Sequence, residues 1–195
     1  MRCPRLLLGF LLFCAALPPL FGRPQSSGAM AGRESAASLV TPEAYVSLEP
    51  VPLNRPFEVA LVVKIADGYH MNSHKPLDAF LIPTDVSAEL PRGFRDLGID
   101  YPEGKLLTLA FSPDKPLSVY SGSVTLRLKL EAASGAALGT QTIPLTLHYQ
   151  ACSDSTCLPP VKVPVKVKLT VATASTQPRA VHPELFSGGS GKTSK

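Results

Sequence analysis

Two cysteines near the end of the chain are the residues best suited to chemistry. Cys152 and Cys157 stand five residues apart and are followed by residues 158–160, Leu-Pro-Pro. Paired thiols at this spacing can form a disulfide, and a disulfide that opens and closes passes two electrons to another protein. The question is whether this pair is a structural staple or a working redox centre.

The first 31 residues have the organisation of a cleaved secretory signal peptide. Arg2 and Arg5 form a positive start, residues 6–17 form an apolar stretch, and residues 29–31 (Ala-Met-Ala) offer a cleavage site with small residues at both ends. The apolar stretch is too short for a comfortable membrane span. We therefore expect a periplasmic or secreted protein, in a compartment where thiols are readily oxidised.

Cys14 lies near the end of this apolar stretch and raises the alternative of a lipoprotein. The bulky Phe13 before it argues against lipidation, because a lipoprotein signal requires a small residue there. Cleavage would remove Cys14 together with Cys3 and leave Cys152 and Cys157 as the cysteines of the mature chain.

The net charge of +4 belongs mostly to the predicted signal peptide, which carries three arginines and no acidic residue. The remainder has 16 basic and 15 acidic residues, a net charge of +1. A nucleic-acid-binding protein would have a concentrated positive charge. The composition therefore gives no support to that class of function.

Alternating apolar and polar residues across 44–172 predict short antiparallel strands. The clearest runs cover 57–65, 124–130, 143–149 and 161–171. Seven to nine strands separated by turns, in about 130 residues, favour an all-β fold of the immunoglobulin-like antiparallel β-sandwich type. No stretch of the mature chain has a long helical period.

Polar, small residues flank this region on both sides. We expect a flexible lead-in at 32–43 and a disordered tail at 173–195. Residues 191–193, Gly-Lys-Thr, resemble the end of a phosphate-binding loop, but Phe186 stands where the leading glycine is required. No cofactor is expected.

The position of the cysteines is compatible with both roles. Alternation places Cys152 with His148 and Gln150 on the wetter face of its strand, and Cys157 returns after four residues to form a hairpin. A disulfide closing so short a loop stabilises by about 2 kcal/mol, against about 4.7 kcal/mol for a 100-residue loop. It is a weak staple, yet the spacing alone leaves the structural and the redox roles open.

Metal binding is a further alternative. Cys152, Cys157 and His148 offer three ligands, whereas a structural zinc site usually has four. His70 and His74, with a methionine between them, could attract copper. A polar turn after a strand explains the same residues without a metal.

Three segments resemble the N-terminal periplasmic domain of the thiol:disulfide interchange protein DsbD. They are residues 149–160, which read Tyr-Gln-Ala-Cys-Ser-Asp-Ser-Thr-Cys-Leu-Pro-Pro, residues 67–74 and residues 101–105. The resemblance covers about residues 40–172. It implies an immunoglobulin-like fold that receives electrons from a thioredoxin-like partner and reduces periplasmic thiol proteins, which serve disulfide isomerisation or cytochrome c maturation.

The resemblance also implies roles for individual residues. Cys152 and Cys157 become the redox pair, with Cys157 forming the mixed disulfide and Cys152 resolving it. A cap that shields the cysteines is implied at 101–104. It consists of Tyr101, Pro102, Glu103 and Gly104, with Tyr101 as the aromatic cover and Glu103 as an acidic neighbour that disfavours the thiolate. The alternative for these four residues is an ordinary turn between strands.

The wall of the site is expected to include two residues of the first segment and four residues that flank the cysteines. These are His70 and Asn72, and His148, Gln150, Asp154 and Pro159. Family members often carry aromatic residues at the positions of His70 and Asn72, and one more residue between the cysteines. The membrane and thioredoxin-like domains of DsbD have no counterpart in this sequence, so the electron donor is expected to be a separate protein. The alternatives are a non-enzymatic binding or assembly module with a structural disulfide, and a periplasmic metal carrier.

Overall fold

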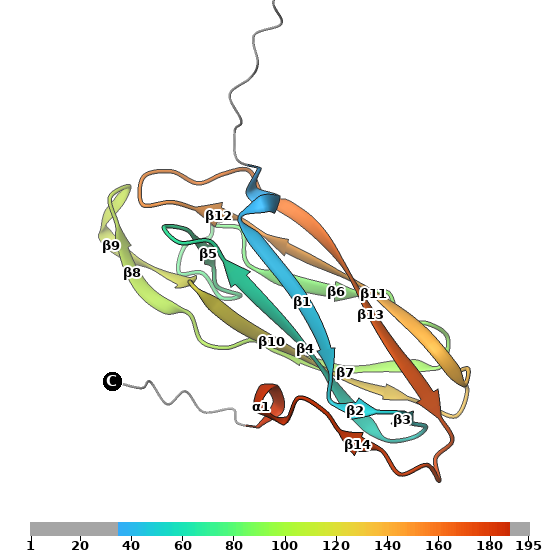
Figure 1. The fold of residues 1–195 in the computed structure, drawn as a ribbon. Coiled ribbons are helices and arrows are strands. Elements are labelled where there is room, and N and C mark those ends of the chain that lie inside the picture. Colours follow the sequence, from blue (N-terminus) through green and yellow to red (C-terminus); the bar gives the residue numbers. More distant parts are fainter. Residues whose placement is uncertain (1–34, 188–195) are drawn as a thin grey trace, which may run out of the picture. The chain divides into compact units, whose positions relative to one another are not determined.

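The computed structural model describes residues 35–187; the predicted signal peptide at 1–31 and the Gly-Lys-Thr at 191–193 lie outside this range. None of the helices within it is long and apolar enough to cross a membrane. In chain order (Figure 1) the elements are η1 (Ala36–Ser38), β1 (Val40–Val46), β2 (Leu48–Glu49), β3 (Val51–Pro52), β4 (Pro56–Ile65), β5 (His70–Asn72), β6 (Asp85–Ala88), β7 (Phe94–Asp100), β8 (Lys105–Leu109), β9 (Ser112–Tyr120), β10 (Ser123–Ala132), β11 (Gly139–Tyr149), β12 (Ala151–Cys152), β13 (Val161–Ala172), β14 (Arg179–Ala180) and α1 (Pro183–Phe186).

Two four-stranded sheets form an immunoglobulin-like β-sandwich, as the alternation predicts. The first has the order β1-β4-β10-β7 and is antiparallel throughout. The second has the order β3-β13-β11-β6, in which only the short β3 runs parallel to its neighbour. The long pairs β4–β10 and β11–β13 give each sheet a continuous inward face.

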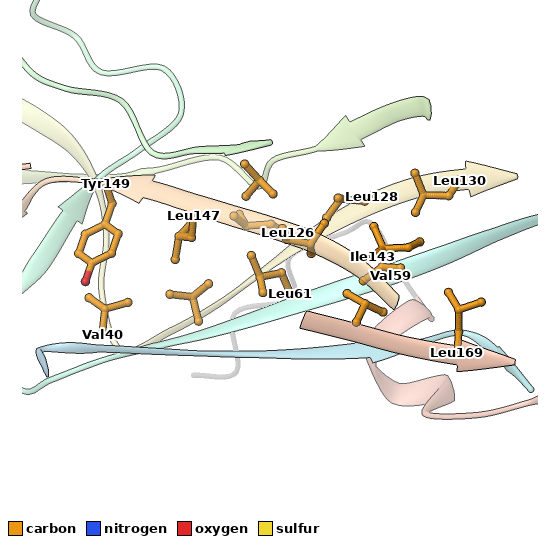
Figure 2. Packing of buried hydrophobic residues seen from close by; sticks show 14 of the residues in the cluster. Val40, Val59, Leu61, Leu126, Leu128, Leu130, Ile143, Leu147, Tyr149 and Leu169 are labelled. Carbon is orange, nitrogen blue, oxygen red and sulfur yellow. The ribbon is translucent and has the colours of Figure 1, made fainter. Parts of the chain in front are cut away.

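Both inward faces pack into one hydrophobic core. Figure 2 shows Leu61 of β4, Leu126 of β10 and Ile143 of β11 projecting into the same interior. The predicted inward residues of the first three runs are buried except for Val124, which is partly buried, and Val167, Leu169 and Val171 complete the core from β13. The remaining inward residues of β13 are only partly buried and pack on its edge: Val161, Val163 and Val165.

A third sheet, with the order β12-β5-β9-β8, carries the cysteines. Its strands prolong those of the sandwich, since β5 follows β4, β12 follows β11 and β9 precedes β10. In Figure 1 the labels of these four strands gather at the same end of the fold. The sandwich therefore holds the cysteine-bearing sheet through three strand continuations.

The ordered fold extends beyond both predicted boundaries, so the lead-in at 32–43 and the tail at 173–195 are wrong for the described residues. At the N-terminal side, η1 and the start of β1 lie within the expected lead-in, and Val40 pairs with Ile65. At the C-terminal side, β14 pairs with β2, and the Arg127 Nε donates to the Leu185 carbonyl oxygen at 2.8 Å. These contacts come from distant strands, which local composition does not report.

Truncating Leu61 to alanine should destabilise the oxidised protein by about 2–5 kcal/mol, because the side chain is fully buried and its removal leaves a cavity. The measurement is the free energy of unfolding from urea titrations. Leu138→Ala is the matched control, since Leu138 is 54% exposed; it should change stability by no more than about 0.5 kcal/mol. Equal losses of unfolding free energy in both variants would contradict the placement of Leu61 in the core.

Candidate functional site

Cys152 and Cys157 form a disulfide with an S–S distance of 2.02 Å. The hairpin that holds it is closed by two backbone hydrogen bonds, from the Ser153 N–H to the Thr156 carbonyl oxygen and from the Leu158 N–H to the Ala151 carbonyl oxygen, both 2.8 Å. Inside the turn, Ser153 Oγ accepts from the Thr156 N–H at 3.3 Å. The two thiols therefore meet at the tip of a hairpin.

The two sulfurs differ in burial. Cys152 is 0% exposed, whereas Cys157 is only partly buried. The expectation that Cys152 lies on an exposed face is wrong. After Tyr149 the chain leaves the sandwich sheet, and β12 pairs with β5, which places Cys152 opposite His70. The chain thus enters another sheet at Cys152, where the alternation of β11 no longer decides which residues are exposed.

Cys152, His70 and Asn72 share one face of this third sheet, because opposite residues and residues two apart point the same way. The loop at 73–84, here called the covering loop, is bound to that face. Asn72 Nδ2 donates to the Ile82 carbonyl oxygen at 2.9 Å, and Thr84 Oγ1 donates to the Asn72 carbonyl oxygen at 2.6 Å. The residues of this loop have no regular pattern, so its role could not be predicted from the sequence.

Gln150 joins the covering loop to the hairpin. Its Oε1 accepts from Asn72 Nδ2 at 3.2 Å and from the Ile82 N–H at 3.5 Å. Its Nε2 donates to the carbonyl oxygen of Leu158, the residue after Cys157, at 3.2 Å. The structure therefore brings two predicted site residues, Gln150 and Asn72, into one network beside the disulfide.

His70 is a buried imidazole without a complete set of hydrogen bonds. It is 2% exposed, and its Nε2 has no hydrogen-bond partner among the described residues. Burial lowers its pKa, and the nearby Asp154 carboxylate opposes that shift only in part. A buried polar atom left unpaired costs about 1–3 kcal/mol, so this position is costly for stability alone.

Residues 101–104, the predicted cap, are anchored by several contacts. The Tyr101 ring stacks on His74 with centroids 3.6 Å apart, and its hydroxyl donates to Asp85 Oδ1 at 2.7 Å. Burial and the Asp85 hydrogen bond raise the pKa of Tyr101. The Tyr120 hydroxyl donates to the Pro102 carbonyl oxygen at 2.8 Å.

Gly104 fits closely against the third sheet. A Cβ at this position would lie 2.2 Å from Ser118 Oγ and 2.7 Å from Ser73 Cβ. Ser73 and Ser118 alternate with residues of the Cys152 face, so their side chains point to the opposite face. Shielding of the cysteines by 101–104 stays a prediction, and the covering loop is the segment bonded to the Cys152 face.

The same segment borders a cavity of about 290 Å³. Its lining includes Glu103, His74 and Lys75. The remaining predicted residues, His148 and Pro159, lie outside this lining: His148 is half-buried on β11 opposite Lys162, and Pro159 is exposed. Within residues 35–187, no three His, Cys, Asp or Glu side chains cluster as a metal site would require.

Residues 36–169 match the family described as "Thiol:disulfide interchange protein DsbD, N-terminal". The reduced N-terminal domain of DsbD from Neisseria meningitidis is a similar solved structure, with 18% identity, a TM-score of 0.44, and coverage of 68% of this chain and 87% of that one. The N-terminal periplasmic domain of ScsB from Proteus mirabilis has 12% identity, a TM-score of 0.44, and coverage of 66% and 46%. Among curated proteins, none matches the chain.

As the pH decreases below 6.5, the free energy of unfolding should fall more steeply for the native chain than for a His70→Gln variant. Because burial lowers the folded-state pKa of His70 below its ordinary 6.5, the unfolded chain binds the proton first as the pH decreases. The contribution is therefore intact above pH 6.5 and is lost as the pH falls through the folded pKa. Urea unfolding across this range measures it, and parallel curves for the two proteins would disprove it.

Gly104→Ala should destabilise the protein by about 1–3 kcal/mol, because the added methyl group has to displace Ser118 or the backbone of 101–104. Gly135→Ala is the matched control, since a Cβ there meets nothing within 4 Å. Thermal unfolding of both variants gives the comparison. A Gly104→Ala protein as stable as the control would show that the segment is loosely held.

Proposed function

Because this chain belongs to the family of DsbD N-terminal domains, we propose that it is a thiol-disulfide exchange protein that passes electrons through Cys152 and Cys157 to secreted thiol proteins. The observation that carries the proposal is the Cys152–Cys157 disulfide, in which one sulfur is buried and the other is partly exposed. The class of enzyme is a protein-disulfide reductase.

The asymmetry of the two sulfurs supports a division of labour. In thiol-disulfide exchange, a thiolate attacks a disulfide sulfur in line, so the attacking group has to be reachable. Cys157 is partly exposed and follows the tight turn, whereas Cys152 is fully buried on β12, which pairs with β5. We assign Cys157 to the mixed disulfide and Cys152 to its resolution.

The energetics also favour a working disulfide over a staple. Closing a six-residue loop contributes about 2 kcal/mol by the chain-entropy estimate. The core already contains the inward residues of two sheets, and a domain of this size has enough buried area to fold without a crosslink. The disulfide therefore adds little that the sandwich lacks.

The partners follow from the chemistry of the pair. A thioredoxin-like electron donor reduces the Cys152–Cys157 disulfide, and the resulting dithiol reduces oxidised thiol proteins of the periplasm or secretory space. Disulfide isomerisation and cytochrome c maturation are the processes such clients serve. Delivery by a cleaved signal peptide at 1–31 belongs to the same proposal.

A Cys152→Ser variant should retain its partner on Cys157 as a mixed disulfide, because the resolving thiol is missing. The variant is isolated from cells under acid quench, and the adduct is identified by mass spectrometry before and after reduction. Cys157→Ser is the matched control and should trap several-fold less, since the remaining sulfur is buried. Equal trapping by both variants would contradict the assignment of Cys157 to the mixed disulfide and of Cys152 to its resolution.

Redox titration of the native chain against glutathione separates this proposal from a structural disulfide. A midpoint potential above about −300 mV is expected for a relay, whereas a lower value indicates a structural bond. A binding or assembly module would also keep its partners after both cysteines are changed to serine. Loss of partner capture in that double variant supports the relay.

A further inference from the structure

His70 is the ionisable side chain directly opposite Cys152 in the third sheet. The antiparallel register pairs the two residues, so their side chains leave the backbone on the same face. Opposite residues in such a pair have Cβ atoms about 4.5–5.5 Å apart. An imidazole and a sulfur at these positions are neighbours inside a region from which solvent is excluded.

The environment leaves one nitrogen of this imidazole unused. His70 Nε2 is buried and has no hydrogen-bond partner among residues 35–187. A buried polar group is ordinarily paired, and a redox or catalytic role is one of the recognised reasons for an exception. Cys152 is fully buried as well, so its thiol, once formed, is shielded from solvent as a proton acceptor.

We propose that His70 accepts the proton of Cys152 when that thiol resolves a mixed disulfide held on Cys157. The inference rests on the proposed function and adds an acid–base residue to it. It is specific to this chain, because the resemblance implies an aromatic residue at this position in many family members.

Neutral His70 Nε2 takes the proton of the Cys152 thiol, and the Cys152 sulfur bonds to the Cys157 sulfur. The bond between Cys157 and the partner's sulfur breaks, and the partner's sulfur leaves with the electron pair as a thiolate. The imidazolium then returns its proton to that thiolate or to solvent, and two electrons have moved from the dithiol to the partner.

The surroundings of His70 are compatible with its accepting the Cys152 proton. Burial favours its neutral form, which is the form that accepts a proton, and Asp154 on the hairpin stabilises the imidazolium that results. The other ionisable groups nearby are engaged elsewhere. On β9, the Tyr120 hydroxyl bonds to Pro102, and in the covering loop the His74 ring contacts Tyr101 and the Thr84 carbonyl oxygen.

Reaction of the reduced chain with the aromatic disulfide dithiobis-nitrobenzoate tests this role. Attack by Cys157 releases the first thionitrobenzoate, and resolution by Cys152 releases the second. His70→Asn should slow the second release about tenfold or more at pH 7, with a much smaller effect on the first. The pH dependence of the second rate should also lose the inflection due to the imidazole.

Two further variants complete the test. His70→Tyr keeps an aromatic ring in the buried position and should slow the second release as His70→Asn does, which separates proton transfer from packing. His182→Asn removes a histidine whose ring contacts Tyr45 of β1, and this variant should react as the native chain does. Circular dichroism confirms that each variant is folded.

The outcomes are distinct. A native second rate and pH profile in both His70 variants would overturn the role of His70 and leave the proposed function intact. A native chain that releases a single thionitrobenzoate would overturn both, because Cys152 would then resolve nothing. Slowed resolution in the His70 variants, together with failure to trap a partner in cells, would support the proton transfer and count against the proposed relay.

Discussion

The side-chain amide of Gln150 is the contact on which the disulfide site depends. The chain changes sheets at this residue, leaving β11 and entering β12, and the amide bonds to Asn72, Ile82 and Leu158 at the point of change. Where a chain leaves one sheet for another, its backbone groups lose their partners in the first sheet and need others. The Gln150 amide accepts from the Ile82 N–H and donates to the Leu158 carbonyl oxygen, and so it fixes the hairpin against the covering loop.

Alternation predicted the sandwich well because the inward face of each strand can be identified from the sequence of that strand alone. Phe57, Leu126 and Leu145 are buried as their place in the pattern requires. The same rule failed at Cys152, which pairs with a strand residue 82 positions earlier in the chain. It also failed after Ala172, where the composition is polar but pairing with β2 and the Arg127 contact hold the segment.

The sequence named some residues that the structure brings together, but it did not indicate how they are arranged. The motif around Cys152 and Cys157 identified the pair, and Asn72 and Gln150 proved to be bonded to each other. The covering loop had no signal, because its contacts are made by backbone groups such as the Ile82 carbonyl oxygen. Irregular segments of this kind are specified by what they bind, which a single sequence does not display.

The pairing of β13 and β14 indicates how much of the chain is needed for independent folding. The family match ends at residue 169, yet Val171 and Ala172 pair with β3, and β14 pairs with β2 beyond them. A recombinant fragment cut at residue 169 would leave both short strands without partners and would expose the Val51 side chain, which is fully buried. The minimal independently stable domain of this protein is therefore longer than the homologous segment, and deletion studies should retain the chain through residue 187.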